Sequence, residues 1–519
     1  MTTHKNSGML RIKISILIFL AAILCCHVSA QSIDPVNPNA TPEAKALLKY
    51  IQSLSGKNIL SGQHNYPASG DRNTQFAADY IGKTPVVWSQ DFGFAADGDK
   101  DSYLSRPAII REAIRQHKKG AIVDLCWHAV PPTANEPVTF QPLPGRDTTS
   151  PLASVQGRLT DKQFRDILTP GTELYKKWVK QVDEIASFLK QLQDANVPVL
   201  WRPYHEMNGD WFWWGGRFEG KYTTAALYKQ IFDRMVKVHK LNNLIWIWSV
   251  DRPSRPGREF VRYFPGSDYL DILAIDIYGN DFNQAYYDGL MSLSKGKPVT
   301  LGEVGNPPSI EVLNRQPNWV FWVVWAGMVR GTSRESYEKL AADPRVLFLE
   351  DRAYINGTRD YRLSCALEPI KLNTEADFTG EWMLNDCESQ ANTGQGPAIP
   401  PHKLIVVQKS NNLNIKSYAV SEYSDDEVTD QSLSLDSKEN ISKVFGDATR
   451  TQTAKWTAQK DTLAIETKIT MHFGGRSNQM NSTEFWTLKK RGKKLVINQT
   501  TDGFMNEGKR TVNLVYDRQ

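Results

Sequence analysis

The stretch ELYKKWVKQVDEIASFLKQLQDANVPVLWRP, Glu173–Pro203, determines the fold class because two structural periods follow each other within it. In its first part, apolar residues recur at steps of three and four from Leu174 to Leu192, which predicts an amphipathic helix. Its last part, Val197–Pro203, is short and largely apolar, as is typical of a parallel strand that is buried on both faces. A helix followed directly by such a strand is the repeating unit of an α/β fold.

The same alternation continues on both sides of this unit, from about residue 42 to about residue 350. Apolar runs predict seven further strands, at Asn58–His64, Pro85–Asp91, Ala121–Trp127, Leu244–Ser249, Ile272–Ile277, Val299–Gly302 and Val320–Ala326. Eight strands that alternate with helices predict a (β/α)₈ TIM barrel. A doubly wound open sheet is the alternative fold, but no G-x-G-x-x-G motif follows an early strand.

Polar side chains follow seven of the eight predicted strands. They are His64, Asp91, His128, His205-Glu206, Asp251, Asp276 with Tyr278, and Glu303. A polar residue at a strand end can simply cap the next helix. Its recurrence at seven ends instead predicts a functional site at the C-terminal mouth of the barrel, where the active sites of TIM barrels lie.

The chain changes character after about residue 360. Short alternating runs predict strands at Lys403–Val407, Leu413–Tyr418, Thr462–Thr470, Glu484–Leu488, Lys494–Thr500 and Arg510–Tyr516. The predicted division is therefore a barrel at residues 31–355 and a smaller all-β domain at residues 360–519, joined near Asn356. The Gly380-x-Trp382 motif before successive hairpins resembles a lipocalin-like domain. Trp382, Trp456 and Trp486 can form either its core or a sugar-binding face.

The first 30 residues have the three parts of a secretory signal peptide. These are a charged start (Lys5, Arg11, Lys13), an apolar run (Ile14–Leu24) and a small-residue exit (Val28-Ser29-Ala30). The run is too short to span a bilayer comfortably, so cleavage and a secreted or periplasmic location are predicted. Cys25 or Cys26 could carry a lipid anchor, but the bulky Leu24 departs from the usual bacterial lipoprotein pattern.

Composition excludes several classes of protein. Hydrophobic residues make up 40% and charged residues 23%, as in ordinary globular domains. The net charge of +5 is spread out without a long Lys/Arg run, so no nucleic-acid partner is expected. Cys126, Cys365 and Cys387 are too scattered for a zinc site, although Cys365 and Cys387 could pair in an oxidising compartment. No metal or cofactor is expected, and the protein is expected to be a monomer.

Two glutamates are the candidate catalytic pair. Hydrolysis of a glycosidic bond needs one carboxyl to protonate the leaving oxygen and another to attack the anomeric carbon or activate water. Glu206 follows the fourth predicted strand and Glu303 ends the seventh, and these strands face each other across a barrel mouth. His205-Glu206 also starts an H-E-x-x-H motif, but position 209 is Gly, which excludes a zinc protease.

The segment WRPYHEMNGDWFWWG, Trp201–Gly215, closely resembles the acid/base segment of glycoside hydrolase family 26. Leu301–Gly305 (LGEVG) resembles the family's nucleophile strand, and Ser61–His64 and Asp276–Tyr278 resemble other family segments. The resemblance covers roughly residues 42–350. It implies a TIM barrel that acts as an endo-β-1,4-mannanase.

The resemblance also implies a role for each matching residue. Glu206 would be the general acid/base and Glu303 the nucleophile. Tyr278 would hydrogen-bond Glu303, and His205 would contact the sugar or the nucleophile. The remaining sugar-binding residues would be His128, Trp211, Asp276 and Trp325. The expected activity is double displacement on mannan, galactomannan or glucomannan, with retention of configuration.

Two other functions remain open from the sequence. The same barrel could act as a β-1,3-1,4-glucanase or a β-1,3-xylanase. A non-catalytic glycan-binding protein is a different class, but loss of either glutamate would be its simplest signature, and both are present. The C-terminal domain could dock to a surface glycan or cell-envelope component, or could form a structural cap on the barrel.

Overall fold

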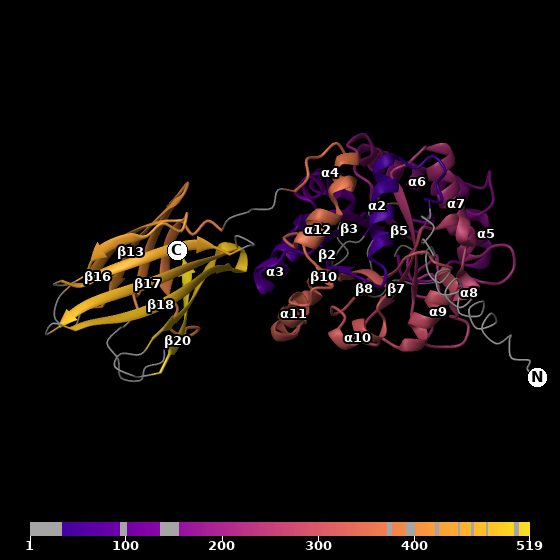
Figure 1. Cartoon of the computed structure of the whole chain (residues 1–519). Coiled ribbons are helices and arrows are strands. Elements are labelled where there is room, and N and C mark those ends of the chain that lie inside the picture. Colours follow the sequence, from indigo (N-terminus) through magenta and orange to yellow (C-terminus); the bar gives the residue numbers. More distant parts are fainter. Residues whose placement is uncertain are drawn as a thin grey trace, which may run out of the picture.

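The computed structural model describes residues 34–93, 101–134, 155–370, 376–390, 400–420, 425–444, 447–457, 461–473, 476–502 and 508–519. The predicted signal peptide lies outside these residues. Figure 1 shows two bodies that follow each other along the chain, a helix-covered barrel and an antiparallel sheet. No helix within the described ranges has the length and apolar character needed to cross a bilayer.

Parallel strands form a closed ring in the first body. They are β1 (Ile59–Leu60), β2 (Gly62–His64), β3 (Val87–Asp91), β4 (Ile122–Trp127), β5 (Val199–Pro203), β6 (Leu244–Asp251), β7 (Ile272–Ile277), β8 (Val299–Val304) and β9 (Trp319–Val324). β1 and β2 together occupy the first predicted strand, and the short β10 (Val346–Leu347) pairs with β1. β9 pairs with both β8 and β2, which closes the ring. The barrel is therefore confirmed, and the open sheet is excluded.

Helices cover the outside of this ring (Figure 1). They are α2 (Pro42–Leu54), α3 (Arg72–Ile81), α4 (Asp101–Lys119), α5 (Asp161–Ile167), α6 (Glu173–Asp194), α7 (Thr224–Asp233), α8 (Phe260–Tyr263), α9 (Gln284–Ser294), α10 (Ile310–Arg315), α11 (Arg334–Ala341), α12 (Arg352–Gly357) and α13 (Arg359–Ser364). In α6 the Thr172 side chain caps the first turn by accepting from the Tyr175 N–H. The predicted apolar face of α6, including Trp178 and Leu189, is buried against the strands.

The last two helices extend the barrel beyond the boundary predicted from the sequence. Tyr354 of α12 and Tyr361 of α13 are buried in one apolar cluster with α2 and the barrel strands. Arg362 donates hydrogen bonds to the backbone carbonyls of His117 (3.3 Å) and Lys118 (3.2 Å). The start of the predicted all-β range is thus helical, and Tyr361 of α13 packs in the same cluster as α2. We propose that the domain boundary lies between residues 370 and 376.

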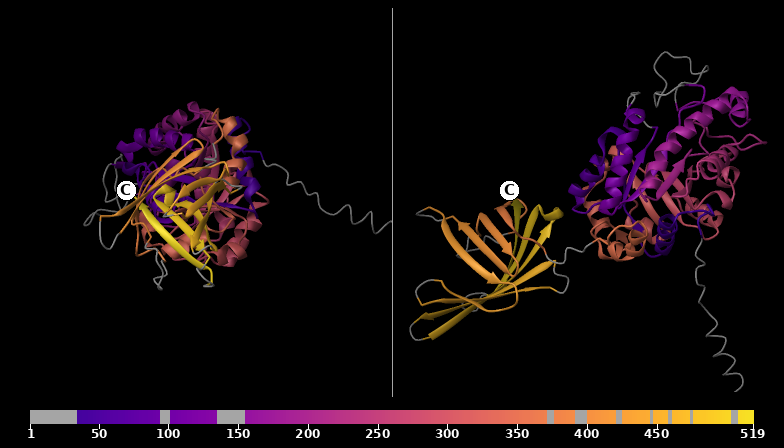
Figure 2. Two further views of the ribbon diagram at one scale, coloured as in Figure 1. Left: turned by 60° about the vertical axis from the view of Figure 1, so that its left-hand side comes forward. Right: turned by 90° about the horizontal axis from the view of Figure 1, so that it is seen from above.

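The second body is one antiparallel sheet of ten strands. They are β11 (Gly380–Leu384), β12 (Lys403–Lys409), β13 (Asn412–Ala419), β14 (Glu427–Ser434), β15 (Asn440–Lys443), β16 (Thr449–Trp456), β17 (Thr462–Phe473), β18 (Arg476–Lys489), β19 (Lys494–Thr501) and β20 (Arg510–Arg518). β11 pairs with both β12 and β20, so the first and last strands of this domain lie side by side in the sheet. Figure 2 shows that the sheet is strongly curved. The all-β prediction is confirmed, whereas the lipocalin-like resemblance stays a prediction.

The sheet has an apolar cluster formed by its own residues. Trp382 and Trp486 are buried in this cluster, and Trp456 packs against it, so these side chains serve as core. One contact with the barrel is made at the β18–β19 turn, where Lys493 Nζ lies 3.0 Å from Asp79 Oδ1 of α3. Cys365 is buried and Cys387 exposed, and both are free thiols, so the disulfide considered from the sequence is not formed.

Candidate active site

The candidate glutamates lie on opposite sides of the barrel mouth. Glu206 follows β5, and Glu303 lies near the C-terminal end of β8. Both side chains are nearly buried, at 8% and 3% exposure. Tyr204 and Glu206 adopt left-handed backbone conformations, with φ of 52° and 51°. Such conformations are costly for residues other than glycine and cluster at functional sites, so the turn after β5 is built to present Glu206.

Glu303 is surrounded by hydrogen-bond donors. The Tyr278 hydroxyl donates to Glu303 Oε2 at 2.7 Å, and the Arg202 guanidinium pairs with Oε1. The same guanidinium pairs with Asp276 Oδ2 at 3.0 Å, while His205 Nε2 lies 3.6 Å from Glu303 Oε1. Burial and the Glu303 charge raise the pKa of Tyr278 well above its usual value, so the phenol keeps its proton and donates it. The Glu303 carboxyl is thus held between Tyr278 and Arg202.

Glu206 lies in a different electrostatic environment. Burial, together with the negative charges of Asp276, Glu303 and Asp251, raises the pKa of Glu206 well above its usual range. Trp211 Nε1 donates to Glu206 Oε2 at 2.6 Å, which opposes this shift without cancelling it. A carboxyl with a raised pKa facing a second carboxyl that is held by an arginine and a tyrosine is the arrangement expected of a general acid and a nucleophile.

The tryptophan-rich loop after Glu206 packs beneath the barrel mouth and fixes the backbone next to Glu206. Trp213 and Trp214 are fully buried, and their indole N–H groups donate at 2.8 Å to the backbone carbonyls of Ala129 and His205. Phe212 stacks on Trp214, with ring centroids 4.4 Å apart. These aromatic residues therefore form a rigid floor that fixes the backbone on both sides of Glu206.

Histidines and Trp325 form the neighbouring wall. His205 is buried, which lowers its pKa well below the usual value and keeps the imidazole neutral. The His128 ring packs edge-on against His205, with centroids 4.3 Å apart. His64 stacks on Trp325 at 3.9 Å, and burial lowers the pKa of His64 to about 3. The ring centroids of His128 and Trp325 lie 5.8 Å apart.

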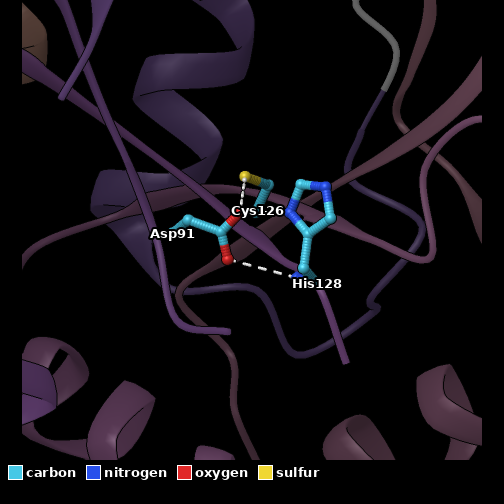
Figure 3. Close-up of side chains that lie close together, drawn as sticks. All are labelled: Asp91, Cys126 and His128. Atoms are coloured by element: carbon cyan, nitrogen blue, oxygen red, sulfur yellow. Dashed lines mark hydrogen bonds and ion pairs between the residues drawn. The ribbon is translucent and has the colours of Figure 1, made fainter. Parts of the chain in front are cut away.

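Asp91 lies between Cys126 and His128 and hydrogen-bonds both of them (Figure 3). Its carboxylate accepts from the His128 backbone N–H at 3.1 Å and from the Cys126 thiol at 3.2 Å, and it also pairs with His128 Nδ1. Burial would raise the pKa of Asp91, but His128 outweighs burial and lowers it below the usual range. Burial raises the pKa of Cys126 well above normal, so its thiol remains a donor.

Two groups of side chains in this region have potential metal-ligand atoms within 4.8 Å of one another. They are Asp91, Cys126 and His128, and His205, Asp276 and Glu303. In the first group Asp91 is already hydrogen-bonded to the other two residues. In the second group the Arg202 guanidinium provides the positive charge between the two carboxylates. Both groups are therefore explained as hydrogen-bonded parts of a carboxylate site.

The structure brings the eight candidate residues together and adds Arg202 to them. Asp276 is fully buried between Arg202 and Ser249, and Trp211 donates its N–H to Glu206. The sugar-binding roles expected of Asp276 and Trp211 stay predictions. The sequence analysis gave no role to Arg202, although it is buried and pairs with Glu303 and Asp276. A charged residue inside an otherwise apolar strand was the available signal.

Comparisons with known proteins place the barrel in a family of glycoside hydrolases. A family model described as glycosyl hydrolase family 26 matches residues 36–348. Mannan endo-1,4-beta-mannosidase from Thermothelomyces thermophilus is 32% identical over 297 residues, which cover 56% of this chain and 56% of the relative. Mannan endo-1,4-beta-mannosidase A from Piromyces sp. is 33% identical over 300 residues, which cover 56% of this chain and 45% of the relative. The chain spans about half the length of these curated relatives.

A solved structure, GH26A from Muricauda sp., matches with a TM-score of 0.55 and 42% sequence identity. The match covers 60% of this chain and 98% of that one. The similarity therefore includes nearly the whole of the solved chain.

Proposed function

Because the chain belongs to glycosyl hydrolase family 26, we propose that it is a secreted retaining endo-β-1,4-mannanase that hydrolyses mannan, galactomannan or glucomannan. The observation that carries the proposal is the pair of buried carboxyls at the ends of β5 and β8. The pKa of Glu206 is raised well above its usual range, and Glu303 accepts from Tyr278 and pairs with Arg202. The names of the relatives support mannan as the substrate.

In the first step of the proposed mechanism, a Glu303 carboxylate oxygen attacks the anomeric carbon. Glu206 donates its proton to the glycosidic oxygen as the carbon–oxygen bond breaks, so the leaving sugar departs as a neutral alcohol. The product is a mannosyl ester of Glu303 and an ionised Glu206. In the second step Glu206 takes a proton from water, and the resulting hydroxyl attacks the anomeric carbon. This attack releases an oligosaccharide whose new reducing end has the β configuration. It also restores both carboxyls to their starting states.

Arg202 and Tyr278 would control the charge of the nucleophile. Both donate to Glu303 in the free enzyme, and they must loosen as negative charge leaves its oxygens during ester formation. His128 and Trp325 would form the sugar-binding wall, with Asp91 fixing the His128 ring.

Purified protein should be tested on galactomannan, glucomannan, lichenan and β-1,3-xylan. The proposal predicts reducing ends from galactomannan and glucomannan at rates well above those from the other two polymers. Faster cleavage of lichenan or β-1,3-xylan would instead favour the glucanase or xylanase alternative. Tight binding of mannan without cleavage would indicate a non-catalytic glycan-binding protein.

The pH dependence of kcat/KM should follow the protonation of Glu206. Only the protonated acid can assist departure, so activity on manno-oligosaccharides is expected to fall as pH rises through the Glu206 pKa. Because that pKa is raised by burial and by Asp276, Glu303 and Asp251, the fall should occur well above the ordinary carboxyl range. Asp251→Asn removes one of these charges and should move the alkaline limb to lower pH. A limb that stays at the same pH in this variant would contradict the assignment.

Removal of the C-terminal sheet should leave an active barrel. A chain cut between residues 370 and 376 retains α12 and α13, and the sheet has its own core. We expect soluble galactomannan activity within about twofold of the full chain, with weaker activity on insoluble mannan because the domain is proposed to dock there.

A second cut near Asn356 is the matched control for this truncation. It also removes Tyr361 and Cys365, which are buried against α2, so this variant should be markedly less stable than the longer one. Thermal unfolding and soluble-substrate assays of both variants separate the two roles. Loss of most soluble-substrate activity after the cut between 370 and 376 would instead make the sheet a structural cap.

A further inference from the structure

We propose that Arg258 is a positioning residue that holds Trp211 so that its indole N–H stays hydrogen-bonded to Glu206. The inference rests on the proposed function, because it concerns the residue that would act as general acid. It assigns a role to the segment between β6 and α8, for which neither the sequence pattern nor the family match supplied one.

The position of the Trp211 ring determines which Glu206 oxygen can carry the acidic proton. Trp211 Nε1 donates to Glu206 Oε2 at 2.6 Å. An oxygen that accepts this hydrogen bond is the poorer site for the proton, so the acidic proton of Glu206 is directed to Oε1. Trp211 therefore controls the direction in which the proton can be delivered.

The Trp211 ring is held against its own loop. A Cβ at position 209 would lie 2.4 Å from the ring, so only glycine allows this approach. Asn208 ties the loop to the end of β6, donating to the Asp251 carbonyl at 2.6 Å and accepting from the Asp251 N–H at 2.7 Å. The loop backbone is thus fixed, and the remaining freedom is rotation of the indole about its side-chain bonds.

Arg258 removes that remaining freedom. Its guanidinium carbon lies 4.7 Å from the centroid of the Trp211 ring, and its Nη2 donates to Asp210 Oδ1 at 2.8 Å. The Arg258 side chain is only 12% exposed, so the guanidinium is confined between the ring and Asp210. A planar guanidinium stacked on an indole attracts it and excludes other rotamers. The Arg258 backbone carbonyl also accepts from Asn208 at 3.0 Å, which links the segment after β6 to the loop that carries Trp211.

Arg255 provides a matched control within the same loop. It donates to the other oxygen of the same carboxylate, Asp210 Oδ2, at 2.6 Å. Its side chain is 54% exposed, and its only ion pair in the part of the chain that the structure describes is with Asp210. Replacing Arg255 therefore removes the same charge and the same kind of ion pair, but leaves the contact between Arg258 and the Trp211 ring in place.

The test measures kcat/KM of full-length wild type, Arg258→Ala, Arg258→Lys, Arg255→Ala, Trp211→Phe and the Arg258→Ala/Trp211→Phe double variant. Two substrates are compared, mannopentaose and 2,4-dinitrophenyl β-mannobioside, whose leaving group needs no protonation. Arg258→Ala should lower kcat/KM on mannopentaose about tenfold and leave the dinitrophenyl substrate within about twofold of wild type. Trp211→Phe should cause a comparable loss, and the double variant should be no worse than the poorer single variant. Arg258→Lys should recover only part of the loss, and Arg255→Ala should match wild type.

Equal losses on both substrates, additive effects in the double variant, or equal behaviour of Arg258→Ala and Arg255→Ala would overturn the inference. Thermal unfolding identifies any variant that fails to fold, and Trp211→Phe then carries the test through the substrate comparison alone. A wild-type protein that cleaves neither substrate would instead overturn the proposed function.

Discussion

Replacing Glu303 with alanine is expected to abolish turnover of mannan and of aryl mannosides alike, by about 10⁴-fold or more. The variant has no carboxylate that can form the mannosyl ester, and a better leaving group cannot replace a missing nucleophile. The loss should therefore be independent of the substrate. It should also appear in the first turnover, because the missing step comes first.

The measurement is the initial rate on galactomannan and on 2,4-dinitrophenyl β-mannobioside, together with the stopped-flow burst of dinitrophenolate. Glu303→Gln keeps the shape of the side chain and should be equally inactive, which separates chemistry from folding. Glu311→Ala, at an exposed carboxylate on α10, serves as the control and should match wild type. A Glu303→Ala protein that retains activity on either substrate would exclude Glu303 as the nucleophile.

Glu206→Ala should fail in a different way. Departure of a sugar alcohol needs a proton, so kcat/KM on manno-oligosaccharides should fall by about 10²–10⁴-fold. Dinitrophenolate is stable without a proton, so kcat/KM on the aryl substrate should change little. The kcat of the variant on the aryl substrate should still fall, because no base activates the water that must hydrolyse the ester on Glu303.

Azide provides the decisive comparison for this variant. It is a nucleophile that needs no general base, and removal of Glu206 leaves space and removes a negative charge at the face where it must attack. Azide should restore kcat on the aryl substrate and yield a β-mannosyl azide, with no effect on wild type. Equal losses on both kinds of substrate without azide rescue would contradict the acid/base role of Glu206.

The fold could be predicted from the sequence where its signal was local. The apolar runs and the three-to-four spacing within Glu173–Pro203 each reflect burial on one element, so the barrel strands were found near their true positions. β14 (EVTDQSLS) was missed because few of its side chains are buried. Its strand conformation comes from pairing with β13, which its composition does not reveal. α13 was missed because its burial depends on α2, which lies some 300 residues earlier in the chain.

The site was predictable to the extent that each residue carried its own signal. Glu206 and Glu303 stand in distinctive segments at strand ends. The partners of Arg202 lie 74 and 101 residues away, so only the closed barrel reveals that it pairs with both Asp276 and Glu303. Arg258 likewise meets Trp211 through the fold, since neither a motif nor a periodic pattern connects the two residues. Contacts between strands are a property of the ring, and a single sequence does not display them.

The central claim is that Glu206 and Glu303 act together by double displacement on β-mannan. Its most direct test is proton NMR of a manno-oligosaccharide digest, recorded before the released sugar can mutarotate. Two inversions at the anomeric carbon give net retention, so the account predicts that the β-anomer of the new reducing end appears first and the α-anomer grows in later. An α-anomer formed first would contradict direct attack by Glu303, and absence of any cleavage product would contradict the proposed activity itself.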